Sequence, residues 1–185
     1  MKKLSTENLK SDTEISETIN VIVGFNGSGK TRLLNKIDSL KDYKSRMISG
    51  DSSIFFEHYP EVLTELNLYF ESIGKRLFLK EGFLLYYEHL NETFYMSTLS
   101  SNELYLIFLM YEVAHYKSLY YDILLIDEIE KGLCLDWQED LLESFTKLAP
   151  NTQFFITTHS PAILMDGHLN TFINMKDLQG FLNEN

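Results

Sequence analysis

The sequence contains a single cysteine, Cys134, and few basic residues relative to its acids. One cysteine excludes a disulfide within the chain, and none of the histidines has the spacing of a dedicated zinc site. The 16 Lys and Arg residues stand against 27 Asp and Glu residues, which gives a net charge of −11 at pH 7. Because non-specific nucleic-acid binding depends on Lys and Arg neutralising phosphates, nucleic acid is expected only together with a partner.

Long apolar runs are also missing. The longest, LYLIFLMY at residues 104–111, falls well short of the roughly 20 residues that a helix needs to cross a bilayer. The opening residues 1–18 are polar and lack the charged-then-apolar pattern of a secretory signal. The sequence therefore predicts no membrane insertion and a cytoplasmic location.

The composition is that of a folded chain, with 185 residues of which 44% are hydrophobic and 14% aromatic. One domain over residues 1–185 is expected. Strand-like apolar runs alternate with helical patterns, which predicts an α/β fold with a mostly parallel sheet flanked by helices. Within residues 51–98, a helical pattern precedes β-rich runs with breaks at residues 81–82 and 89–91, which predicts a small helical insertion with a β-hairpin or a three-stranded meander.

The stretch VIVGFNGSGKT, residues 21–31, combines a buried strand with the pattern G-x-x-x-x-G-K-[ST]. Glycines let the backbone turn tightly and aim successive N–H groups at a polyphosphate, and a helix beginning near Lys30 adds its positive end. Lys30 can then reach the β- and γ-phosphates of ATP, and the Thr31 hydroxyl can ligate Mg²⁺. The alternative is a glycine-rich turn between a strand and a helix.

Polar side chains follow two further predicted strands. Asp127 and Glu128 follow the apolar run 123–126, and His159 follows FFITT at residues 154–158. At the end of a central strand, Asp127 can hold the Mg²⁺ shell, Glu128 can orient and deprotonate a water, and His159 can bond the γ-phosphate or that water. The alternatives are a solvated acidic turn and a histidine bonded to backbone.

The ordered set GFNGSGKT, LSSNE, ILLIDE and ITTHSP resembles the ATP-binding cassette ATPase superfamily. It looks closest to the soluble branch with the overcoming-lysogenization-defect-type ATPases of phage defence, and is more distantly similar to the chromosome-maintenance ATPases. The resemblance runs from about residue 19 to residue 175. It implies a P-loop NTPase fold and a head-to-tail homodimer that sandwiches two ATP molecules, each held with Mg²⁺ between the phosphate loop of one subunit and the signature of the other.

The resemblance also implies roles for individual residues. Glu128, His159 and Lys30 would be catalytic, and Thr31 and Asp127 would bind the metal. Residues 99–103 would be the signature and residues 130–138 the loop along the dimer seam. The nucleotide-binding residues would be Gly24, Asn26, Gly27, Ser28, Gly29, Lys30, Thr31, Arg32 and, from across the dimer, Ser100.

The sequence departs from the family pattern in three places. Asn102 stands where related signatures have glycine, and an ordinary capped helix start is the alternative reading of this segment. The family's glutamine after the first helix is not found, so Asp51 is a candidate for its contact with the metal shell. Cys134 lies where the seam loop often carries aspartate or histidine, and a small half-buried residue is the simpler interpretation.

The predicted function is an ATPase that closes as a dimer on ATP and regulates a separate effector protein, in phage defence by family analogy. The alternatives are a nucleotide-holding scaffold with little hydrolysis and the ATP-binding subunit of a membrane transporter. A small-molecule kinase is disfavoured because Arg32, Arg46 and Arg76, the only arginines, do not cluster. The aromatic-rich middle can be core or a partner-docking face; its residues are Phe55, Phe56, Tyr59, Tyr69, Phe70, Tyr86 and Tyr87.

Overall fold

A parallel sheet forms the centre of the molecule. The computed structural model describes residues 2–9, 13–48, 59–81, 84–164 and 172–183. Its five-stranded sheet has the order β2-β6-β7-β1-β8, and every pairing in it is parallel. The strands are β1 (Ile19–Val23), β2 (Ser45–Ile48), β6 (Ile123–Ile126), β7 (Gln153–Thr158) and β8 (Ile173–Asn174).

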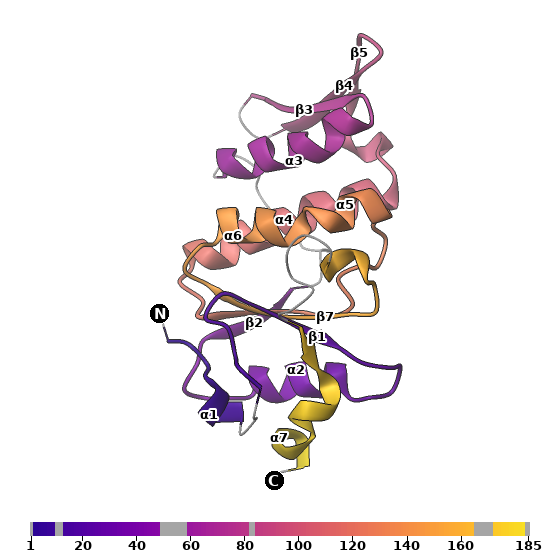
Figure 1. The fold of residues 1–185 in the computed structure, drawn as a ribbon. Coiled ribbons are helices and arrows are strands. Elements are labelled where there is room, and N and C mark those ends of the chain that lie inside the picture. Colours follow the sequence, from indigo (N-terminus) through magenta and orange to yellow (C-terminus); the bar gives the residue numbers. More distant parts are fainter. Residues whose placement is uncertain (1, 10–12, 49–58, 82–83, 165–171, 184–185) are drawn as a thin grey trace.

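Helices cover both faces of this sheet, as Figure 1 shows. On one face lie α4 (Ser101–Ser118), α5 (Leu135–Glu139) and α6 (Leu141–Leu148). On the other lie α1 (Thr6–Leu9), α2 (Lys30–Asp38) and α7 (Gln179–Asn183). The prediction of an α/β fold with a mainly parallel, helix-flanked sheet is confirmed. Within the described residues, no helix is long and apolar enough to span a bilayer.

Neighbouring residues of β7 enter opposite cores because side chains alternate along a strand. Phe154 packs in the core under α4 and α6, with its ring stacked 5.6 Å from that of Phe145. Phe155 packs in the second core, on the side of α1, α2 and α7. Both rings are fully buried, so the strand has no face open to solvent. This accounts for its continuous apolar run rather than an alternating pattern.

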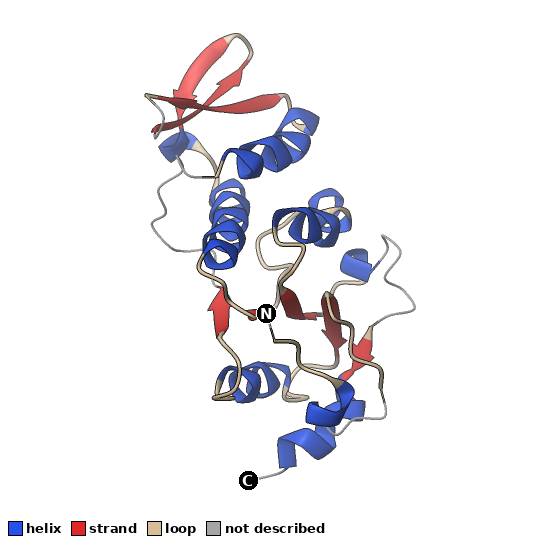
Figure 2. Cartoon of the chain, turned by 90° about the vertical axis from the view of Figure 1, so that its left-hand side faces the viewer, coloured by secondary structure: helices blue, strands red, loops and turns tan. Residues whose placement is uncertain are grey.

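The insertion between β2 and α4 contains a second sheet. It consists of α3 (Pro60–Ser72) followed by the antiparallel strands β3 (Lys75–Lys80), β4 (Leu84–His89) and β5 (Glu92–Tyr95). Leu90 and Asn91 join β4 to β5 with φ of 52° and 62°, the positive values that a tight two-residue hairpin requires. The three-stranded alternative is the observed one, and Figure 2 shows this sheet at the far end of the molecule from the parallel sheet.

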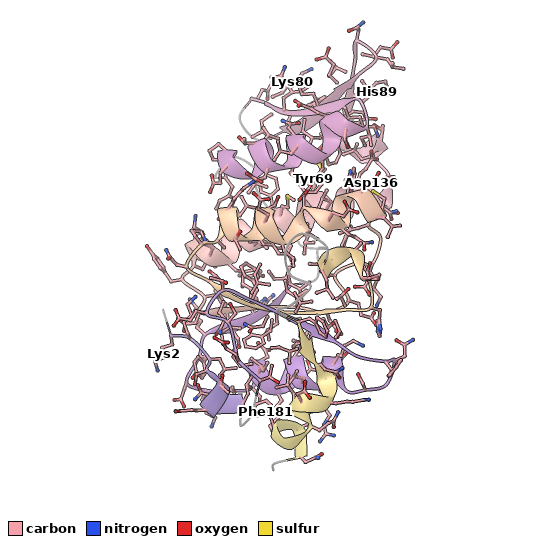
Figure 3. The ribbon with its side chains drawn as sticks, viewed as in Figure 1. Lys2, Tyr69, Lys80, His89, Asp136 and Phe181 are labelled. Atoms are coloured by element: carbon pink, nitrogen blue, oxygen red, sulfur yellow. The ribbon has the colours of Figure 1, made fainter. Side chains whose placement is uncertain are left out.

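Helix α3 connects the insertion to the body. The Asn67 side chain bonds both backbone groups of Leu77, so it covers the outer edge of β3 as a further strand would. On the other side of α3, the Tyr69 hydroxyl lies 2.9 Å from Ser144 Oγ of α6, and Figure 3 shows Tyr69 between these layers. Tyr69 and Phe70 also contact the Trp137 ring. Tyr69 and Phe70 are therefore core residues and not part of a partner-docking face.

Several elements differ from their sequence patterns. The apolar pattern of DWQEDLLESFTKL, residues 136–148, is typical of one helix, but the structure has two, because Asp140 takes ψ near 0° between α5 and α6. The strand β2 was not expected, since its sequence SRMI is half polar; its pairing with β6 creates it. The last strand covers only Ile173–Asn174, and a 3-10 helix (Met175–Leu178) and α7 follow it. Asp51, Phe55 and Phe56 lie outside the described residues.

Candidate nucleotide site

Three neighbouring strands end at the same edge of the parallel sheet. β7 lies between β1 and β6, and the register pairs Val23 with Thr158 and Ile126 with Ile156. The segments that follow these strands therefore meet: residues 24–29 after β1, residues 127–134 after β6 and residues 159–161 after β7. Figure 1 shows the loop after β1 projecting from the right-hand edge of the sheet. Such strand ends are where open α/β sheets bind ligands.

The loop over residues 24–29 has a backbone that requires glycine. Gly27 and Gly29 have φ of 75° and 99°. A Cβ on Gly24 would lie 2.6 Å from Ser28 Oγ and 2.8 Å from the Cβ of Met175, which leaves no room for a side chain. Ser28 Oγ is buried and has no hydrogen-bond partner among the described residues. A loop that leaves a buried hydroxyl unpaired and begins a helix at Lys30 fits a bound phosphate.

Lys30 is folded back onto this loop. Its side chain is nearly buried, with 6% of the residue exposed. The ammonium donates to the carbonyls of Gly24 at 2.9 Å and Phe25 at 3.4 Å, and lies 2.8 Å from His159 Nε2. Because an ammonium can only donate, Nε2 accepts and the imidazole carries its proton on Nδ1. A polyphosphate in the loop would replace these neutral acceptors with charged ones.

Thr31 and Asp127 lie side by side. The Thr31 hydroxyl donates to Asp127 Oδ2 at 2.6 Å, and Thr157 donates to Oδ1 at 2.5 Å. A hydroxyl and a carboxylate in contact at a strand edge are the protein ligands that suit Mg²⁺. Among the residues that the structure describes, no group of three or more His, Cys, Asp or Glu could hold a metal, so the other ligands would be phosphate oxygens and water.

Glu128 takes an unusual backbone conformation for a residue with a side chain, with φ of 51°. Its N–H donates to Thr157 Oγ1 at 2.8 Å, which ties it to β7. Its carboxylate forms an ion pair with Lys131, three residues on. The hydrogen bond and the charge of Glu128 raise the pKa of Lys131. The carboxylate is one-third exposed, so the ion pair holds it at the rim of the site rather than inside it.

Glu130 is a site residue that the sequence interpretation did not single out. Its Oε2 accepts from the Thr158 hydroxyl at 2.7 Å and its Oε1 accepts from the His159 N–H at 2.8 Å. These bonds fix the turn that presents the His159 ring. Gln138 continues the network by accepting from the Ser160 hydroxyl at 2.5 Å. In the sequence, Glu130 is visible only as the third acid of the run DEIE at residues 127–130. The strand order is needed to show that it faces Thr158 and His159.

The segment 99–103 begins α4 with a capping box. The Ser100 backbone N–H and hydroxyl both donate to Glu103 Oε2 at 2.7 Å, and the Glu103 N–H donates back to Ser100 Oγ at 3.3 Å. Lys75 pairs with the same carboxylate at 2.5 Å. Burial alone would raise the pKa of Glu103, but the bonds from Lys75 and Ser100 outweigh it and lower that pKa.

The structure does not bring every predicted residue to the loop. Ser100 is exposed and lies at the start of α4, which Figure 1 shows well above the loop after β1. Asn26 belongs to the loop and lines the cavity beside it, whereas Arg32 is directed away and donates to the Leu182 carbonyl at 3.2 Å. Asn102 lies against the seam loop, where a Cβ on Gly132 would be 3.3 Å from Asn102 Oδ1.

A cavity opens beside the loop. Its volume is about 530 Å³, and it lies between the loop after β1, the turn after β7 and the end of β8. Phe25, Pro161 and Phe172 give it apolar walls, with His159 and Ser28 on its polar side. Its size is in the range of small-molecule sites. Phe25 itself is 80% exposed.

Three comparisons with known proteins agree on the type of domain. Residues 64–166 match the family model described as "AAA domain, putative AbiEii toxin, Type IV TA system". A retron Vc95 probable ATPase from Vibrio cholerae serotype O1 biovar El Tor is 43% identical over 44 residues, which is 24% of this chain and 9% of that protein. The chain thus matches less than a tenth of the length of this curated relative.

Two solved structures share the fold. The SMC head domain from Thermotoga maritima superposes with a TM-score of 0.57 and 15% identity, over 87% of each chain. An SMC head bound to the C-terminal winged-helix domain of ScpA superposes with a TM-score of 0.59 and 11% identity, again over 87% of each chain. Because both identities are low, these structures show only that the chain shares the fold of SMC heads, and the assignment to an ATPase-type domain rests on the family match.

Proposed function

The chain belongs to the AAA domain family described as a putative AbiEii toxin of a type IV toxin–antitoxin system, and from this premise we propose that it binds and hydrolyses ATP with Mg²⁺. The observation that carries the proposal is the meeting of three strand ends. There Lys30 contacts His159, and Thr31 contacts Asp127, across separations of more than ninety residues in sequence. A glycine-rich turn without a ligand gives no reason for these contacts.

Each side chain has a role that its position supports. Lys30 would leave its carbonyl acceptors for the β- and γ-phosphates, and Thr31 and Asp127 would hold Mg²⁺, which offsets the phosphate charge. Glu128 would deprotonate the attacking water after releasing Lys131. His159, held by Glu130, would accept or donate a hydrogen bond at the γ-phosphate.

We propose further that two copies close head to tail on ATP, as the resemblance to ATP-binding cassette ATPases of the overcoming-lysogenization-defect type implies. In support, Ser100, Ser101 and Asn102 are exposed at the start of the 18-residue helix α4. A helix of this length has free N–H groups and a positive end there, which suits a γ-phosphate from the other copy. The site of one copy would then be complete only with Ser100 of the second.

The proposed role of this closure is to regulate a separate effector protein, in antiviral defence. The antiviral context rests on the resemblance to the overcoming-lysogenization-defect-type ATPases, and the family description, which names a putative toxin, supports a toxin-type system. The SMC head bound to ScpA shows that a domain of this fold in another protein binds a protein partner.

A second candidate is a module that holds ATP with little hydrolysis. Two observations favour it: Lys131 pairs with the carboxylate of Glu128, and Asn102 occupies the space beside Gly132 at the seam. Either feature could prevent the site from closing without a partner protein.

The mass in solution of Glu128→Gln, with and without Mg-ATP, tests the proposal. We expect a change from monomer to dimer on adding Mg-ATP, because nucleotide binds but is not turned over. Glu128→Gln/Ser100→Asp is the matched control: aspartate still caps a helix, but its charge repels a phosphate, so the dimer should be lost. ATP binding without dimer formation in Glu128→Gln would favour the holding module, and no ATP binding would reject both candidates.

A further inference from the structure

The outward face of the antiparallel sheet carries a row of aromatic rings. Phe78 of β3 pairs with Tyr86 of β4, and Tyr86 pairs with Tyr95 of β5, so the three side chains are direct cross-strand neighbours. The Phe78 and Tyr86 rings are 6.2 Å apart at 25°, and the Tyr86 and Tyr95 rings are 5.2 Å apart at 65°. The row thus crosses the whole width of the sheet.

This face is exposed, whereas the opposite face is core. Leu77, Leu85 and Tyr87 alternate with the row and are buried under α3. In the row, Tyr95 is 42% exposed and the other two rings are half-buried. Figures 1 and 2 agree that the sheet lies at one end of the molecule, with α3 on its inner side. The aromatic row is therefore not needed to close the core.

Cations flank the row. Lys80 Nζ lies 4.4 Å from the centre of the Tyr86 ring and 5.8 Å from that of Phe78. Arg76 lies on the same face at the other end of β3, about 14 Å away at the usual rise of a strand. Figure 3 shows Lys80 at the outer end of the molecule. Glu88, opposite Arg76, is the one carboxylate that the register of the paired strands places on this face.

We propose that this face binds single-stranded nucleic acid. Bases stack on exposed aromatic rings whatever their sequence, and neighbouring cations pair with the phosphates. Two cations and one carboxylate give the face the opposite sign from the chain, whose net charge is −11. The rest of the surface would repel a polyanion, so binding would be confined to this platform and would weaken with salt. An aromatic row in contact with a lysine suits bases and phosphates better than an apolar peptide.

The proposal modifies the expectation, drawn from the net charge, that nucleic acid binds only together with a partner. The chain has too few basic residues to contact many phosphates over a wide surface. Stacking of bases on aromatic rings, in contrast, does not depend on the net charge of the protein. The platform is also separate from the ATP site, because it lies on the insertion and not at the carboxyl edge of the parallel sheet. Binding there would not require nucleotide.

Fluorescence anisotropy with the full chain tests this surface. The probes are fluorescein-labelled oligo-dT and oligo-rU of about 20 nucleotides at about 50 mM salt, so the two arms separate DNA from RNA. We expect binding of at least one probe, and about tenfold weaker binding by Tyr95→Ala or Tyr86→Ala. Lys80→Glu should also weaken binding and make its salt dependence shallower.

Matched controls separate stacking from folding. Tyr95→Phe keeps the ring and should bind as wild type does, and Tyr120→Ala removes a 78% exposed tyrosine elsewhere and should have no effect. Because Tyr95 is partly exposed, Tyr95→Ala should fold even if Tyr86→Ala does not. The proposal is overturned if wild type fails to bind either probe at about 100 µM protein. It is equally overturned if Tyr95→Ala and Lys80→Glu bind as tightly as Tyr120→Ala, because the probe would then bind elsewhere.

Discussion

The two sheets of this protein are buried in different ways, and the difference decides where each can bind a ligand. Every strand residue of β6 and β7 is buried, because helices cover both faces of the parallel sheet. Only the ends of these strands remain accessible. In the antiparallel sheet, the buried Leu85 and Tyr87 of β4 alternate with residues that are partly or fully exposed, so one whole face is accessible.

The two regions therefore suit different kinds of ligand. At the strand ends, three distant segments of the chain bring Lys30 and Thr31, Asp127, and His159 together in a small volume, which suits a phosphate group and a metal ion. On the open face, rings and cations spread over three strands, which suits an extended polymer. Chemistry is expected at the parallel sheet and recognition at the antiparallel one.

The largest expected effect is a loss of stability, and it differs between the two sheets because their side chains are buried to different extents. Phe155→Ala should lower the free energy of unfolding by about 3–5 kcal/mol, because Phe155 is fully enclosed in the core beside α2. Tyr95→Ala, on the open face, should change it by less than about 1 kcal/mol. Urea denaturation of both variants measures the contrast. Equal losses would mean that the open face is part of the core.

The second prediction concerns the strand ends. Lys30→Ala should weaken ATP binding by about a hundredfold, roughly 2.7 kcal/mol, because it removes the ammonium that we propose binds the phosphates. Isothermal titration with Mg-ATP measures the change, and Lys41→Ala, an exposed lysine after α2, is the control. Unchanged affinity would show that the loop is a turn and not a phosphate site.

The third prediction concerns the capping box of α4. Since the folded-state pKa of Glu103 is lowered, its stabilising contribution is complete above the unfolded pKa of about 4.3 and is lost as the pH falls through the folded pKa. Glu103→Gln should therefore cost about 1 kcal/mol of stability at pH 7. The difference in the free energy of unfolding between wild type and Glu103→Gln should shrink below about pH 4, as measured by denaturation. A gap that stays constant with pH would assign the cost to packing instead.

The smallest effect is expected at the rim of the proposed ATP site. Lys131→Ala should raise basal ATP turnover about two- to threefold, because it frees the Glu128 carboxylate from an exposed ion pair. Lys147→Ala, which removes a comparable exposed pair with Glu143, should leave turnover unchanged. A phosphate-release assay detects the change. A fall in turnover would mean that Lys131 takes part in the site instead of restraining it.

The sequence predicted the parallel sheet and its loop well because these features are local. The apolar runs of β1, β6 and β7, the glycines of the loop and the acids after β6 can all be read from adjacent residues. A hairpin or a three-stranded meander was also predicted, since breaks at residues 81–82 and 89–91 interrupt a β-rich run, and the structure shows the meander. Roles for Glu128, His159 and Ser100 remain predictions.

Features that depend on contacts between distant segments could not be predicted. The role of Glu130 requires β6 and β7 to be neighbours. The short strand β2 exists because β6 is available to pair with it. The aromatic row depends on the register of three strands, and a shift of one residue would turn its rings into the core.

The central claim is that the ends of β1, β6 and β7 form an ATP-hydrolysing site. The most direct test compares wild type with Glu128→Gln in ATP turnover and in affinity for Mg-ATP. The account predicts that turnover falls by about a hundredfold or more while affinity changes little, because a general base is removed and the phosphate loop is not. Wild-type-like turnover in Glu128→Gln would contradict it, and would remove Glu128 from the chemistry at this edge of the sheet.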